Sequence, residues 1–163
     1  MTDHSKSNQL AIELNCEQSM IEFAGRLSVL IERLAEPLLI GLSGDLGAGK
    51  TTLCRGLLYG LGHSGAVKSP TYTLIEAYEL AIGKVLHVDL YRLVDPQELE
   101  CMGFIDYLHQ SQLCLIEWPE SGHGYLPKPE LLIKIIPSKT GRYVTLVANK
   151  PCGKVLLEGM SSQ

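Results

Sequence analysis

The segment at residues 44–51, with the sequence GDLGAGKT, constrains this chain more than any other feature, because it matches G-x-x-x-x-G-K-[ST] at every fixed position. It follows a continuous apolar run at 38–42 and precedes a helix-forming stretch at 51–61. Glycines let backbone N–H groups curl around a phosphate without Cβ clashes, and the following helix adds the positive end of its dipole. The segment therefore predicts a strand, a phosphate-binding loop and a helix, in that order.

The residue types of this loop predict a nucleoside triphosphate held together with Mg²⁺. Lys50 supplies a point charge to the β- and γ-phosphates, and the Thr51 hydroxyl ligates the metal. GTP is disfavoured because residues 149–152 (NKPC) lack the final Asp that reads guanine, and Arg92 stands where a GTPase has glycine. The expected cofactors are therefore ATP and Mg²⁺. The expected nucleotide-binding residues are Asp45, Leu46, Gly47, Ala48, Gly49, Lys50, Thr51, Thr52 and Thr71.

Two acidic residues stand where apolar runs end, as a metal–triphosphate site requires. Asp89 ends the run LHVD, and Glu117 ends the run LCLIE. Because the carboxyl ends of buried parallel strands meet at the edge of the sheet that carries the glycine loop, we expect both acids to lie there. One would bind Mg²⁺ while the other orients or deprotonates the attacking water, and the residues leave this choice open. The plainer alternative is that each acid caps a turn.

Three further positions have two interpretations each. Thr71 lies in the loop SPTYT, about twenty residues after Lys50, where P-loop enzymes place a mobile hydroxyl-bearing segment; an ordinary turn has the same composition. Arg92 either stabilises the charge of a transferred phosphate or forms a surface salt bridge. Trp118, the only tryptophan, either packs in the core or contacts a base or a partner.

Composition excludes several classes of protein. The net charge is −4 and no Lys/Arg cluster is present, which argues against a protein that grips nucleic acid alone. The five cysteines are widely spaced without a C-x-x-C pair, so neither a disulfide framework nor a zinc site is expected. No apolar run approaches the ~20 residues that cross a bilayer, and the N-terminus lacks a secretory signal. We expect a cytoplasmic protein without membrane contact.

The apolar pattern predicts an α/β fold of the P-loop NTPase class, with a mixed sheet, parallel core strands flanked by antiparallel strands, and helices on both faces. Strands are expected at 10–14, 38–42, 73–80, 84–90, 113–116, 130–136 and 142–147. Helices are expected after an Asn15 N-cap as far as residue 36, at 51–61, and after an Asp95 N-cap as far as residue 102. The chain 1–163 is expected to form one domain, with residues 1–9 and 150–163 flexible or peripheral.

Four segments taken together resemble the bacterial TsaE (YjeE) ATPases. They are 44–52 (GDLGAGKTT), 69–73 (SPTYT), 87–93 (HVDLYRL) and 116–120 (IEWPE), in the same order as in the family. The likeness covers about residues 10–147. The glycine motif alone is common to many families, whereas the other three segments together are specific.

This resemblance implies an ATPase needed to make threonylcarbamoyladenosine in tRNAs that read codons beginning with A. The implied partners are the TsaD and TsaB proteins, with tRNA held mainly through the complex, and we allow for weak self-association. By analogy with the family, Lys50 holds phosphate, Thr51 and Glu117 hold Mg²⁺, Asp89 acts on water or the metal, and Thr71 belongs to a switch-like loop. Lys50, Asp89 and Glu117 are thus the expected catalytic residues.

Two other functions fit the same fold. A small-molecule kinase would clamp two phosphorylated substrates with several arginines, yet the chain has five arginines and none in the loop 119–129. A nucleotide-switched adaptor would bind ATP with little turnover. ATP hydrolysis coupled to a partner fits the sequence better than either.

Overall fold

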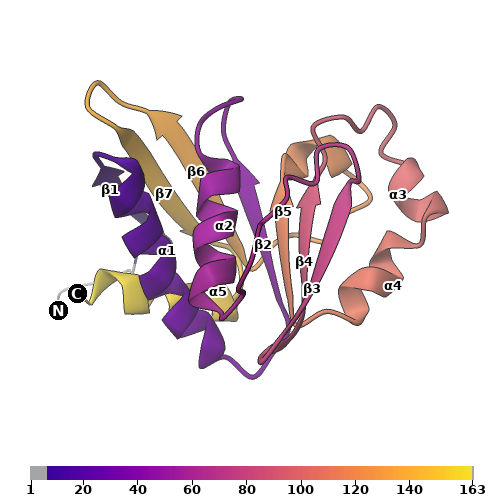
Figure 1. The fold of residues 1–163 in the computed structure, drawn as a ribbon, viewed down its shortest axis with the longest axis horizontal. Helices are drawn as coiled ribbons and strands as arrows, with labels where there is room; N and C mark the ends of the chain where they lie inside the picture. The colour runs from indigo at the N-terminus through magenta and orange to yellow at the C-terminus, as the bar shows by residue number, and fades with distance from the viewer. Residues whose placement is uncertain (1–6, 163) are drawn as a thin grey trace, which may run out of the picture.

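The computed structural model describes residues 7–162, and these form one seven-stranded sheet with the order β1-β7-β6-β2-β5-β4-β3 (Figure 1). The four neighbours β6, β2, β5 and β4 are parallel, whereas β7, β1 and β3 pair antiparallel at the two sides. The predicted mixed sheet is confirmed. The strand bounds are β1 Gln9–Leu14, β2 Leu38–Ser43, β3 Ile75–Leu80, β4 Gly83–Asp89, β5 Leu113–Glu117, β6 Leu131–Pro137 and β7 Arg142–Ala148.

The burial of each strand explains its sequence. All five residues of β5 are buried, because helices cover both faces of this central strand and leave no position for a polar residue to reach water. In β6 and β7 the buried positions alternate with more exposed ones, as expected where one face is covered. The expected antiparallel strands that flank the parallel core include two hairpins, β3–β4 and β6–β7.

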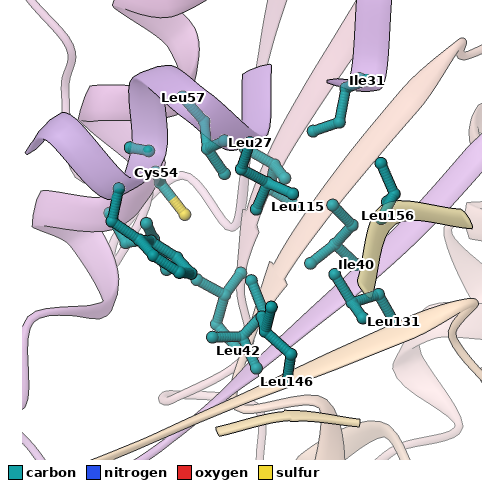
Figure 2. Close-up of a cluster of buried hydrophobic side chains, with 14 of the residues drawn as sticks. Leu27, Ile31, Ile40, Leu42, Cys54, Leu57, Leu115, Leu131, Leu146 and Leu156 are labelled. Atoms are coloured by element: carbon teal, nitrogen blue, oxygen red, sulfur yellow. The ribbon is translucent and has the colours of Figure 1, made fainter. Parts of the chain in front are cut away.

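Helices lie on both faces of the sheet, as predicted. On one face α1 (Glu17–Glu32), α2 (Lys50–Gly60) and α5 (Pro151–Ser161) cover a large apolar cluster (Figures 1 and 2). On the other face α3 (Glu98–Cys101) and α4 (Phe104–His109) cover a smaller cluster around Phe104, and η1 (Pro119–Gly122) follows β5. No described helix is long and apolar enough to cross a membrane.

Three predicted helix boundaries are wrong. The N-cap of α1 is Cys16 instead of Asn15, because the Cys16 thiol accepts from the Ser19 amide and the Ser19 hydroxyl accepts from the Cys16 amide at 3.2 Å. This reciprocal pair sets the first turn one residue later, and α1 ends four residues before the expected position. The Asp95 carboxylate accepts a hydrogen bond from the Gln97 amide within a turn, and α3 starts only at Glu98. The short helix α4 was not expected.

The expectation of a flexible or peripheral segment at 150–163 is wrong for residues 151–161. They form α5, whose apolar side buries Leu156, Leu157 and Met160 against the sheet and α1. The Arg26 guanidinium of α1 also donates to the Met160 carbonyl at 3.1 Å. Pro151 begins this helix at a position where its missing N–H costs nothing. The helix completes the core that β7, β6 and α1 leave open.

Replacing Gly153 by alanine tests how tightly α5 is seated. A Cβ at Gly153 would lie 1.9 Å from the Glu130 carbonyl oxygen, so α5 must shift away from the start of β6. We expect Gly153→Ala to lower the free energy of unfolding by about 1–3 kcal/mol, measured by urea denaturation.

The matched control is Gly25→Ala, in the middle of α1. A Cβ there meets nothing within 4 Å, so the higher helix propensity of alanine should raise stability by roughly 0.5–1 kcal/mol. A Gly153→Ala variant that is as stable as the wild type would show that α5 has room to move.

Candidate functional site

The glycine loop joins β2 to α2, as predicted, at the carboxyl end of a central parallel strand. Gly47 and Gly49 have φ values of +79° and +113°, which L side chains rarely adopt. A Cβ at Gly44 would lie 2.5 Å from the Ile135 carbonyl oxygen, so only glycine fits there. Gly49 is also the N-cap of α2 and has no side chain to accept from the first-turn N–H groups. These groups are suited to an anion at the start of α2.

Lys50, the first residue of α2, turns its amine back over the loop. Nζ donates to the carbonyl oxygens of Gly44 and Asp45, the latter at 2.8 Å, and lies 4.2 Å from the centroid of the Trp118 ring. Burial lowers the pKa of Lys50, although the carboxylates of Glu117 and Asp89 oppose this shift. A phosphate group beside this amine would favour its charged form.

The two strand-end acids lie side by side, since Asp89 and Glu117 are register partners at the ends of β4 and β5. Both are almost fully buried. The Glu117 carboxylate accepts from the Thr51 hydroxyl, at 2.9 and 3.1 Å to its two oxygens, and from His87 Nε2 at 2.7 Å. The Asp89 carboxylate accepts from the Tyr91 amide at 2.9 Å and from the Thr71 hydroxyl at 3.0 Å.

The two carboxylates therefore have different partners. Glu117 accepts a hydrogen bond from Thr51, which directly follows Lys50. Asp89 accepts one from Thr71, which lies in the segment 69–73. Within that segment the Ser69 and Thr71 hydroxyls lie 2.7 Å apart. Thr71 is thus attached to the site through Asp89.

A pocket of about 420 Å³ brings most of the expected residues together. Leu46, Gly47, Gly49, Lys50, Thr51, Thr52, Thr71, Asp89 and Glu117 line it, with Tyr91, Arg92, Trp118 and Arg142. Asp45 and Ala48 contribute their backbone carbonyls, to Lys50 and to Arg142 respectively, instead of lining the pocket. The oxygen donors of Thr51, Glu117 and Asp89 are the hard ligands that Mg²⁺ prefers, and the loop amides with Lys50 suit a polyphosphate.

The sequence model of the family described as "Threonylcarbamoyl adenosine biosynthesis protein TsaE" matches residues 14–144. The chain belongs to the TsaE family. The resemblance found in the four sequence segments is confirmed.

Individual TsaE proteins and one solved structure agree with this assignment. The "tRNA threonylcarbamoyladenosine biosynthesis protein TsaE" of Haemophilus influenzae is 45% identical over 148 residues, which is 90% of this chain and 94% of that protein. The protein of the same description from Borreliella burgdorferi is 35% identical, over 84% of this chain and 98% of its own. The crystal structure of YdiB from Bacillus subtilis superimposes with a TM-score of 0.78 at 28% identity, covering 94% of each chain.

Three residues of this TsaE-family site have roles that the sequence did not indicate. Arg142, the first residue of β7, donates from Nε to the Ala48 carbonyl and holds the glycine loop from the side. The hairpin that delivers it is 94 residues away along the chain, so no local pattern could signal this contact. His87 forms a hydrogen bond with Glu117. In the sequence, the only sign of this role was a single histidine within an apolar run. Arg92 lies 4.3 Å from the centroid of the Tyr72 ring, a stacking contact that neither expectation included.

Trp118 adopts a left-handed conformation, with φ +58°, immediately after Glu117. Its amide donates to the Leu42 carbonyl at 3.1 Å, which fixes the backbone beside β2. The ring lies between the Lys50 amine and Tyr91, whose ring centroid is 5.1 Å away. The single tryptophan therefore lies where its fluorescence can report changes at the glycine loop.

Proposed function

We propose that this TsaE-family chain is a Mg²⁺-dependent ATPase that supports threonylcarbamoyladenosine modification of tRNAs reading codons that begin with A, in the cytoplasm and together with TsaD and TsaB. The observation that carries the proposal is the meeting of Lys50 and Thr51 of the glycine loop with Glu117 and Asp89 at one edge of the sheet. A triphosphate, a divalent cation and an attacking water each find a matching group there.

The hydrogen bonds suggest which acid has which role. Glu117 accepts from Thr51, so we assign Thr51 and Glu117 to Mg²⁺. Asp89 is instead joined to Thr71, so we assign Asp89 to the attacking water and Thr71 to a segment that responds to the γ-phosphate. Lys50 holds the β- and γ-phosphates. The bound Mg²⁺ would neutralise charge that develops on the phosphate oxygens.

The structural role of residues 149–152 supports ATP over GTP as the nucleotide. Pro151 begins α5, and the Asn149 side chain donates to the Pro129 carbonyl at 3.1 Å. This segment is therefore engaged in packing, and it lacks the acidic residue that would read guanine.

Coupling to partners is supported by charge. The chain has a net charge of −4, so holding tRNA through TsaD and TsaB agrees better with its composition than direct binding does.

The release of phosphate from ATP tests the proposal. With Mg²⁺, we expect slow release by the chain alone and strong stimulation when TsaB, TsaD and tRNA are added, because the complex would close the site. Phosphate from [γ-³²P]ATP should appear as free phosphate. Label transferred to a metabolite would instead identify a kinase, and nucleotide-dependent partner binding without turnover would identify an adaptor.

A further inference from the structure

His87 is a buried polar residue whose known partner is a single carboxylate. It lies in the middle of β4, fully buried under α2, with Val85 before it and Asp89 after it on the same face. Nε2 lies 2.7 Å from Glu117 Oε1. Within the part of the chain that the structure describes, Nδ1 is buried and has no hydrogen-bond partner.

A histidine in this position has an energetic cost. A buried polar atom without a hydrogen-bond partner lowers stability, and the register partner of His87 on β5 is the apolar Leu115. A leucine would fill the same space without this penalty. The hydrogen bond to Glu117 is therefore the feature that distinguishes His87 from an apolar core residue.

Cys54 of α2 also lies close to His87 and Glu117. One ligand atom each of Cys54, His87 and Glu117 lies within 4.8 Å of the others. Burial among apolar side chains raises the pKa of the Cys54 thiol well above its ordinary value, which disfavours a free thiolate at this position (Figure 2). A tetrahedral Zn²⁺ would hold its nitrogen and oxygen ligands about 3.4 Å apart. The 2.7 Å separation of His87 Nε2 and Glu117 Oε1 is that of a hydrogen bond.

The Glu117 carboxylate is thus held from two sides. The Thr51 hydroxyl has one proton and can donate it to one oxygen at a time. His87 supplies the second donor, because a carboxylate can only accept. With Oε1 bonded to His87, Oε2 remains within hydrogen-bond distance of the Thr51 hydroxyl, at 3.1 Å.

We infer that His87 is a positioning residue for the cation site: its Nε2–H fixes the Glu117 carboxylate so that this carboxylate and the Thr51 hydroxyl face Mg²⁺ together. The inference rests on the proposed Mg²⁺-dependent binding of ATP. Outer-shell donors of this kind typically change metal affinity by about 10- to 100-fold when they are removed.

Two substitutions of His87 by amide side chains of different length test the inference. In His87→Gln the amide nitrogen extends about as far as Nε2, whereas in His87→Asn it reaches only about as far as Nδ1. Trp118 fluorescence follows binding of the β,γ-imido analogue of ATP, first in EDTA and then during a Mg²⁺ titration. We expect His87→Asn to weaken the apparent Mg²⁺ affinity about 10- to 100-fold and His87→Gln to stay close to the wild type. Binding in EDTA should be the same in all three proteins.

The outcomes separate this inference from the proposed function. If Mg²⁺ does not improve analogue binding by the wild type, both are wrong. If the wild type responds to Mg²⁺ and the Asn and Gln variants match each other, the positioning role alone is wrong. His87→Asn should also add nothing to the loss of Mg²⁺ affinity in Glu117→Gln, because His87 acts through that carboxylate. A large additional loss would overturn the inference.

A measurement on the unmutated protein gives the same answer if the asparagine variant does not fold. Long-range ¹H–¹⁵N spectra of the imidazole should show Nε2 of His87 carrying a proton, with a chemical shift that changes in Glu117→Gln. An unprotonated Nε2 would contradict the inference.

Discussion

Replacing Lys50 by methionine is expected to lower the rate of ATP hydrolysis about 100- to 1,000-fold, because the developing charge on the phosphates loses its nearest fixed cation. The Lys50 amine lies over the glycine loop and bonds to two of its carbonyl oxygens, so it already lies where we propose that phosphate binds. The effect should appear both in the affinity for ATP and in turnover, each measured with and without TsaB, TsaD and tRNA.

The fold should survive this substitution. Lys50 is 4% exposed, and burial lowers its pKa, so folding disfavours the charged form of the amine. At a pH between the pKa of Lys50 in the folded protein and its higher pKa in the unfolded chain, the unfolded chain binds more protons than the folded protein. The stability of the wild type therefore rises with pH across that window. Below it the cost of burying the charge is fully present. Methionine removes this cost, so Lys50→Met should unfold at an equal or higher temperature than the wild type at a pH below this window.

Lys154→Ala, at an exposed lysine on α5, is the matched control. It should leave turnover and ATP affinity unchanged. A well-folded Lys50→Met protein with wild-type turnover would show that the loop does not bind the phosphates in the proposed way.

Glu117→Gln and Asp89→Asn should both lower turnover strongly, for different reasons. Each change removes one negative charge with little change of shape. Because Glu117 accepts from Thr51, its loss should weaken the Mg²⁺-dependent part of ATP binding. Because Asp89 is joined to Thr71, its loss should leave Mg²⁺-dependent binding intact and lower turnover by about 100-fold or more.

Equilibrium binding of the β,γ-imido analogue, with Mg²⁺ and with EDTA, separates these effects from phosphate release. Glu100→Gln, an exposed acid on α3, controls for the change of net charge and should behave as the wild type. If Asp89→Asn loses the Mg²⁺ response and Glu117→Gln retains it, the two assignments must be exchanged.

The sequence alone determined the features whose causes are local. The glycine loop, the apolar runs that became β2 and β5, and the two hairpins depend on residues within one element and its immediate flanks. The end of α2 is also local: Gly62 has a φ of +94°, and the amides of Gly62 and His63 bond back to the last turn. The acids at the ends of β4 and β5 were also predictable, since parallel strands deliver their carboxyl ends to one edge.

Only the tertiary structure decided how these parts are supported. The hydrogen bond of His87 to Glu117 spans 30 residues and that of Arg142 to the loop spans 94, and neither leaves a pattern in its own segment. The helix α5 forms because β6, β7 and α1 offer an apolar surface to Leu156 and Met160, a surface that exists only after the sheet has assembled. The sequence therefore determined which groups could perform the chemistry, and long-range packing decided which neighbours hold each group in place.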